Sequence, residues 1–200
     1  MNKKLIRNYL IMIAGSLLIG CGVSLIVYAA LGADALTTFE DGLTRLFHVS
    51  LSTSTLIANL LFISLIFLLD RKRVSIDTLL CPLFISLGVK LFTAIFPNVS
   101  AMPLRVIYML AGLVIISLGV GVGAQSPTGS SPYDGFVLAA SIKTGRDYRL
   151  VRWTIDIITL LAGILLKGSW GIGTIMSIAF IGIIAKFFIE HLKKLKIFRS

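Results

Sequence analysis

Arg152 and Asp156 are opposite charges set four residues apart at the start of a long apolar stretch. On a helix this spacing places both side chains on one face, where they can form an ion pair. Asp156 falls about two turns into the apolar stretch, where an ionisable group is costly and usually faces protein or a water-filled cavity. The pair indicates either part of a binding site for a small polar or anionic solute, or a salt bridge that fastens one helix to its neighbours.

A second polar cluster, Ser131-Pro132-Tyr133-Asp134, has the form of a helix start. Ser131 can cap the helix, Pro132 suits the first turn, and Asp134 can return a hydrogen bond as the third member of a capping box. The polar stretch before it, which contains Gly129, can break a membrane helix and aim the new helix N-terminus at a ligand. The alternative is a capped interfacial helix that only connects two membrane spans.

Weaker candidates lie elsewhere in the chain. Thr37 and Glu40 have the capping-box spacing without a proline, and predict a second short helix. Asn59 is a polar residue inside another apolar stretch. Lys90 and Lys186 lie about five residues from the ends of apolar stretches, so both are secondary site candidates whose long side chains can instead reach the membrane surface.

The composition places all of these residues in a membrane protein. Of 200 residues, 56% are hydrophobic and 14% are charged, with a mean hydropathy of +0.96, whereas soluble domains are about 45–50% apolar. The net charge of +10 comes from basic clusters beside the apolar stretches, a pattern that sets membrane orientation and does not favour nucleic-acid binding. Cys21 and Cys81 show no metal-ligand spacing, and the sequence predicts neither a metal site nor a cofactor.

Six stretches are long enough to cross a hydrocarbon core of about 30 Å. They cover roughly residues 9–30, 51–70, 75–96, 104–124, 150–167 and 171–191. With six spans, all four basic clusters fall on one side, which predicts that both termini are cytoplasmic. A crossing by the segment 34–47 would move Arg71-Lys72-Arg73 to the outside, so this segment and its counterpart 131–144 are expected to be short helices that do not span.

The chain also carries an internal repeat. Ala14, Gly15 and Gly22 recur as Ala111, Gly112 and Gly119, a shift of 112 − 15 = 97 residues. The shift also pairs Asn59 with Asp156, so the two side chains could face each other across a central site. Residues 1–200 are therefore expected to form one all-α membrane domain, with repeat 1 over about 9–97 and repeat 2 over about 104–191.

Each repeat holds three spans and one short helix, and three is an odd number. The two repeats are therefore expected to be inverted relative to each other in the membrane, as in many secondary transporters. Because the second repeat holds the proline-capped helix and the Arg152–Asp156 pair, we expect it to carry most of the chemistry.

These motifs resemble the YczE/YyaS/YitT-like bacterial membrane proteins. The resemblance rests on Leu31-Gly32-Ala33-Asp34, the segment 129–135, Lys143-Thr144-Gly145, the Arg152–Asp156 pair and Gly171-Ile172-Gly173-Thr174. The family's short-helix motif resembles Leu-Gly-x-x-Pro-x-Asp in both halves, but this chain has Ala35 and Thr37 at those positions of the first half. The absence of a soluble C-terminal extension favours the YczE/YyaS branch.

We expect a multi-pass protein of the bacterial cytoplasmic membrane that acts as a small-solute transporter or permease. The expected site comprises Asp156, Arg152, Asn59, Ser131, Pro132, Asp134 and Gly129. The alternative is a non-transporting module that binds or regulates a partner membrane complex, and either form could associate with further copies of itself. No Ser/His/Asp, Cys/His or metal-ligand cluster falls within the apolar stretches, so the sequence does not predict an enzyme.

Overall fold

The computed structural model describes residues 3–71, 74, 76–126 and 131–194. This part of the chain forms eight α-helices and no strands. They are α1 (Lys3–Ala29), α2 (Ala35–Phe47), α3 (Leu51–Leu69), α4 (Ile76–Ile95), α5 (Met102–Gly123), α6 (Pro132–Thr144), α7 (Tyr148–Leu165) and α8 (Ile172–Leu192). The all-helical class that the composition predicts is confirmed.

Five of the helices in the described part are long and apolar enough to cross a membrane: α1 from Ile6 onward, α3, α4 from Thr78 onward, α5 and α8. The sixth expected span corresponds to α7, which has 18 residues but carries Arg149, Arg152 and Asp156. With these three charges, α7 is not apolar enough to be counted among the five. The chain is thus a multi-span membrane protein.

The two short helices, α2 and α6, have 13 residues each and would extend about 20 Å. Ser131 caps α6, with Pro132 in its first turn and Gly145 ending it in the left-handed conformation. The Asp134 carboxylate accepts a hydrogen bond from the Ser131 hydroxyl, at 2.6 Å, and not from the Ser131 backbone N–H as a capping box requires.

The expected box of Thr37 and Glu40 at the start of α2 is wrong. Asp34 is the cap, and its carboxylate accepts a hydrogen bond from the Thr37 backbone at 3.4 Å. Glu40 does not reach back to the helix start, because its carboxylate accepts a hydrogen bond from Thr55 on α3 at 2.7 Å. The side chain of Glu40 therefore links α2 to α3.

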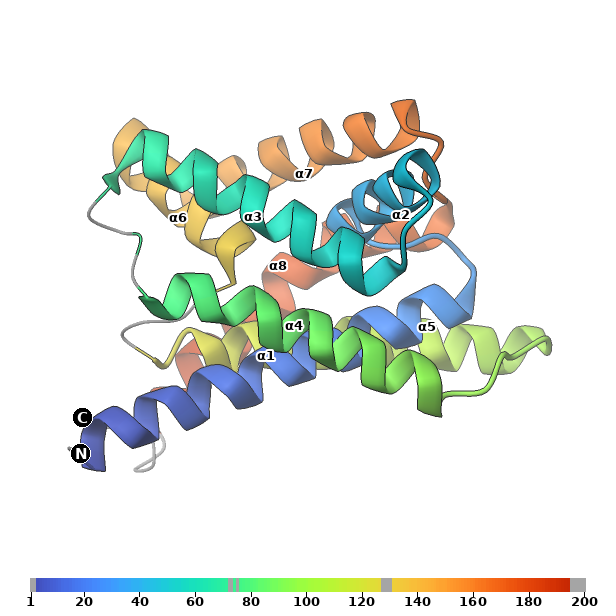
Figure 1. The fold of residues 1–200 in the computed structure, drawn as a ribbon, viewed down its shortest axis with the longest axis horizontal. Helices are drawn as coiled ribbons and strands as arrows, with labels where there is room; N and C mark the ends of the chain where they lie inside the picture. The colour runs from blue at the N-terminus through green and yellow to red at the C-terminus, as the bar shows by residue number, and fades with distance from the viewer. Residues whose placement is uncertain (1–2, 72–73, 75, 127–130, 195–200) are drawn as a thin grey trace.

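The helices form two groups of four (Figure 1). In one group, α1 packs along α4 and α5, and α5 packs along α8. In the other, α2 packs on α7 and α3 on α6, while α2 also contacts α3 and α6 contacts α7. We call these the scaffold group (α1, α4, α5, α8) and the polar group (α2, α3, α6, α7). Their most extensive mutual packing is between α3 and α4.

Glycines hold α1 against α5. A Cβ at Gly15 would lie 2.8 Å from the Gly123 nitrogen and 2.9 Å from the Gly119 oxygen, and a Cβ at Gly22 would lie 2.8 Å from the Gly112 oxygen. Gly15, nearer the start of α1, meets the end of α5, whereas Gly22, farther along α1, meets an earlier part of α5. The two helices are therefore antiparallel, as Figure 1 also shows. These glycines thus let α1 and α5 touch backbone to backbone.

Candidate functional site

A small cavity of about 40 Å³ lies between the two helix groups. We call it the central cavity. Apolar side chains of the scaffold group form one wall: Ile19, Val23, Ile85, Ile116, Val120 and Ile181. The polar group and its N-caps form the opposite wall, with Leu36 and eight polar side chains: Asp34, Thr37, Glu40, Asn59, Ser131, Tyr133, Asp134 and Arg152. The starts of both short helices therefore meet at this cavity.

Arg152 is the centre of a buried ion-pair network in the polar wall. Its Nε lies 3.1 Å from each carboxylate oxygen of Asp156, and its NH1 pairs with Asp134 on α6. The guanidinium carbon also lies 4.8 Å from the centre of the Tyr133 ring, while the Tyr133 hydroxyl donates to Asp156. These contacts join α6 to α7. Two carboxylates share one guanidinium, so the network carries an excess negative charge when both are ionised.

Glu40 and Asn59 line the α2–α3 side of the cavity, Thr55 is hydrogen-bonded to both, and each of the three is 1% exposed. Besides its bond to Glu40, Thr55 accepts a hydrogen bond through its backbone oxygen from Asn59 Nδ2 at 2.8 Å. Burial raises the pKa of Glu40 to about 8, against the lowering effect of the Thr55 hydrogen bond, and the charge of Asp34 raises the pKa further. Glu40 is therefore poised to hold a proton near neutral pH.

Three oxygen atoms of the cavity-lining residues have no hydrogen-bond partner among the residues that the structure describes: Asp34 Oδ1, Thr37 Oγ1 and Asn59 Oδ1. Buried polar groups are nearly always paired, and each exception calls for an explanation such as a water or an ion. Burial raises the pKa of Asp34, while the hydrogen bond from the Thr37 backbone lowers it. Asp34, Thr37 and Asn59 therefore leave buried oxygens in the cavity wall without a partner in the described structure, and we call these three residues the Asp34–Thr37–Asn59 edge.

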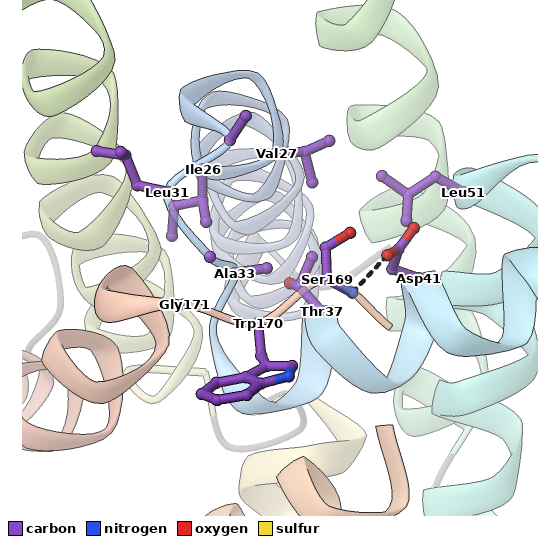
Figure 2. Close-up of a pocket in the computed structure, with 12 residues that line it drawn as sticks. Ile26, Val27, Leu31, Ala33, Thr37, Asp41, Leu51, Ser169, Trp170 and Gly171 are labelled. Carbon is purple, nitrogen blue, oxygen red and sulfur yellow. Dashed lines mark hydrogen bonds between the residues drawn. The ribbon is translucent and has the colours of Figure 1, made fainter. Parts of the chain in front are cut away.

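Two larger pockets flank the central cavity. The α1/α2 pocket, of about 520 Å³, lies among the end of α1, the first half of α2, the start of α3 and residues 169–171. Figure 2 shows its lining, including Thr37 and the hydrogen bond from the Ser169 backbone to Asp41, 2.7 Å long. The α6/α8 pocket, of about 430 Å³, lies among the end of α5, α6, the start of α7 and the end of α8.

Each flanking pocket shares a polar residue with the central cavity. Thr37 lines both the α1/α2 pocket and the cavity, while Asp134 lines both the α6/α8 pocket and the cavity. The ends of the antiparallel helices α1 and α5 belong to different pockets, so the pockets lie toward opposite ends of the bundle. The central cavity thus shares lining residues with a pocket toward each end of the bundle.

The structure brings together most of the residues that the sequence singles out. Asn59, Ser131, Asp134 and Arg152 line the central cavity. Asp156 supports it by binding Arg152 and Tyr133. Pro132 is buried in the first turn of α6.

The remaining predicted residues lie elsewhere. Gly129 falls outside the described residues. Lys90 is exposed on α4. Lys186 is half exposed on α8, lines the α6/α8 pocket and pairs with Glu190 at 3.8 Å, as its spacing predicts. The two lysines are therefore not part of the central cluster.

The polar side chains of the cavity wall come equally from the two halves of the chain, and the expectation that the second repeat carries most of the chemistry stays a prediction. Asp34, Thr37, Glu40 and Asn59 come from the first repeat, and three of them hold the unpartnered oxygens. A signal for Asp34 is present in the 97-residue shift, which aligns Asp34 and Thr37 with Ser131 and Asp134. Each helix start has one acid and one hydroxyl three residues apart, but in the opposite order.

Comparisons with known proteins place the chain in a family. The model of a family of unknown function (DUF6198) matches residues 6–190. The chain is 28% identical over 188 residues to the uncharacterized membrane protein YczE of Bacillus subtilis (strain 168), covering 94% of this chain and 87% of that protein. It is 22% identical over 183 residues to the uncharacterized protein YyaS of the same organism, covering 90% and 91%.

A further relative is an uncharacterized protein of Haemophilus influenzae, 25% identical over 178 residues, which cover 89% of this chain and 81% of that protein. No solved structure matches the chain. The expected likeness to YczE and YyaS is confirmed, whereas the likeness to YitT stays a prediction. The match over nearly the whole helical bundle shows that this chain is a membrane protein of the DUF6198 family.

Proposed function

We propose that this protein transports a small solute across the bacterial cytoplasmic membrane by exposing the central cavity alternately to the two flanking pockets. The observation that carries the proposal is that one buried polar cavity shares Thr37 with one pocket and Asp134 with the other. Under the 97-residue shift, Thr37 and Asp134 are counterparts. The two boundaries of the cavity thus occupy equivalent positions in the two repeats.

The pockets themselves are related by the same shift. Four residues of the α1/α2 pocket have counterparts in the α6/α8 pocket: Val27 and Ala124, Thr37 and Asp134, Asp41 and Leu138, Leu51 and Tyr148. Together with the antiparallel packing of α1 on α5, this supports two inverted repeats with six spans, α7 being the sixth. In that arrangement the two termini lie on the cytoplasmic side together with the α6/α8 pocket, and the α1/α2 pocket opens outward.

The two helix groups supply a means of alternation. The central cavity lies between an apolar wall of the scaffold group and a polar wall that belongs to the other group. A small rotation of one group against the other would widen one boundary of the cavity while narrowing the other. Rocking of one bundle around a fixed site is the motion that inverted-repeat transporters commonly use.

The charges of the site favour a neutral or cationic solute over an anionic one. Three carboxylates lie in or beside the central cavity, from Asp34, Asp134 and Asp156, against the one guanidinium of Arg152, while Glu40 holds a proton near neutral pH. With two of the carboxylates already paired to Arg152, an entering anion would meet further negative charge in a buried space.

Alternating access can be tested without knowledge of the solute. Single cysteines at Leu51, Leu138 and Asn59, in a chain with Cys21 and Cys81 changed to alanine, would be exposed in proteoliposomes to a small charged methanethiosulfonate reagent. Leu51→Cys should react from one side of the membrane, Leu138→Cys from the other, and Asn59→Cys from both. Ile158→Cys on α7, 62% exposed where lipid is expected, is the unreactive control.

The proposal fails if Asn59→Cys reacts from one side only or from neither side while the two pocket cysteines react. That outcome would describe a static bundle and would favour the non-transporting module that binds a partner membrane complex.

A further inference from the structure

We propose that the Asp34–Thr37–Asn59 edge of the central cavity is a binding site for a sodium-sized monovalent cation. This inference deepens the proposed transport function, on which its biological role rests, but the binding itself is a separate property. It is carried by the direction of the unpartnered atoms, the balance of charge and the size of the cavity.

The direction of the Asn59 amide is set by its neighbour. The backbone oxygen of Thr55 can only accept a hydrogen bond, so the amide nitrogen of Asn59 must face it, at 2.8 Å. This fixes the amide oxygen as the atom that remains without a partner in the cavity wall. A buried acceptor of this kind requires a donor or a cation as its ligand.

Asp34 supplies a negative charge at the same edge. Its Oδ2 caps α2 through the Thr37 backbone, which leaves Oδ1 unpartnered within the described structure. Asp34 forms no ion pair with any residue of the described part of the chain. The nearby guanidinium, Arg152, is already shared by two other carboxylates. A bound cation would balance charge that the protein leaves unbalanced.

The volume and the donor atoms suit a small, singly charged ion. A cavity needs roughly 10–15 Å³ to hold one water, so the central cavity of about 40 Å³ has room for a small ion together with water. Its available ligands are a carboxylate, an amide oxygen and a hydroxyl oxygen, all of which are hard donors that bind hard cations. No group of three or more His, Cys, Asp or Glu side chains in the described residues is arranged to hold a metal ion. One charged ligand with two neutral ones fits a single positive charge.

The test is equilibrium binding of ²²Na⁺ to the purified full-length protein in detergent, with choline as the replacement cation. The wild type should bind one ion per chain saturably. Asp34→Asn keeps a helix-capping oxygen and Asn59→Leu keeps the side-chain shape, so both should fold, which elution as a single species would verify. Each variant should bind ²²Na⁺ at least tenfold more weakly. Asp70→Asn, at the end of α3, and Asn98→Leu, in the connection after α4, are the matched controls and should bind as the wild type does.

Three results would overturn the proposal: no saturable ²²Na⁺ binding by the wild type, equal binding by Asp34→Asn and Asp70→Asn, or displacement of ²²Na⁺ by Ca²⁺ at lower concentration than by unlabelled Na⁺. Binding and transport can fail separately. Saturable ²²Na⁺ binding with Asn59→Cys reactive from one side only would retain the cation site and refute transport. Reactivity of Asn59→Cys from both sides without ²²Na⁺ binding would retain transport and refute the cation site.

Discussion

Thr37 and Asp134 stand at the two boundaries of one cavity, each shared with a different flanking pocket. They lie 97 residues apart and occupy the third position of the two short helices. Their side chains nevertheless differ in charge, so the two boundaries are equivalent in position but not in chemistry. Asp134 is fixed by Arg152, whereas the Thr37 hydroxyl has no hydrogen-bond partner in the described structure. The side chain at the Thr37 boundary is therefore less constrained than the side chain at the Asp134 boundary.

Asp156→Asn should destabilise the protein strongly, because it removes one of the two carboxylates that compensate the buried Arg152 guanidinium. Breaking one partner of a buried pair typically costs about 3–5 kcal/mol. The thermal midpoint in detergent measures the change. Glu190→Gln disrupts the exposed pair with Lys186 and should alter stability by less than about 1 kcal/mol. Equal effects of the two substitutions would contradict a structural role for the Arg152 network.

Gly119→Ala should weaken the packing of α1 on α5. Its Cβ would lie 2.8 Å from the backbone oxygen of Gly15 and 2.8 Å from Ile19, so the helices would have to separate. Such overpacking costs about 1–3 kcal/mol, and the thermal midpoint should fall accordingly. Gly182→Ala on α8 is the control, because no atom lies within 4 Å of its Cβ. A thermal midpoint of Gly119→Ala equal to that of the wild type would show that the α1–α5 contact can accommodate a methyl group.

Stability should decrease as the pH rises toward the pKa of Glu40. Burial raises the pKa of this carboxyl from 4.5 to about 8, so the folded state binds its proton more tightly than the unfolded state does. The contribution of that proton is complete below pH 4.5 and is lost as the pH rises through about 8. In sodium-free buffer, the thermal midpoint of the wild type should fall between about pH 6 and pH 9. The midpoint of Glu40→Gln, which stays neutral, should fall by about 5 °C less over the same range.

The control for this comparison is Glu190→Gln, which removes an exposed carboxylate and should keep the wild-type pH profile. Parallel profiles for the wild type and Glu40→Gln would mean that Glu40 is ionised throughout the range.

The orientation can be checked by labelling. Cysteines replacing Asn98, between α4 and α5, and Lys143, at the end of α6, should react with an impermeant maleimide from opposite sides of the membrane, Asn98→Cys from outside. Reaction of both cysteines from the same side would refute the six-span arrangement, because α5 alone is expected to cross the membrane between them.

The sequence predicted the helical class, the limits of both short helices and the residues Arg152, Asp156, Asn59, Ser131 and Asp134, because apolar length, capping chemistry and spacing are local properties. The Arg152–Asp134 pair was not predictable in this way. It joins two helices, and only their packing brings α6 beside α7.

The hydrogen bond of Glu40 was likewise not predictable from the local sequence. Its spacing from Thr37 suggested a local hydrogen bond at the helix start, but Thr55 on α3 is its actual partner. A carboxylate in a connecting segment is normally solvated, and nothing in the local pattern indicates that α3 covers this one. The cap of α2 is different, because the 97-residue shift aligns Asp34 with the capping residue Ser131 and so contains a signal for it.

The glycine packing of α1 on α5 has the form of a symmetric dimer interface enclosed within one polypeptide, because each helix offers the same small residues to the other. The connection from α4 to α5, residues 96–101, supplies none of these glycine contacts. Cutting it should leave two fragments that recognise each other: residues 1–97 and 98–200, produced together as separate chains, are expected to co-purify as a one-to-one complex. The connecting loop would then serve to keep the two partners in equal number.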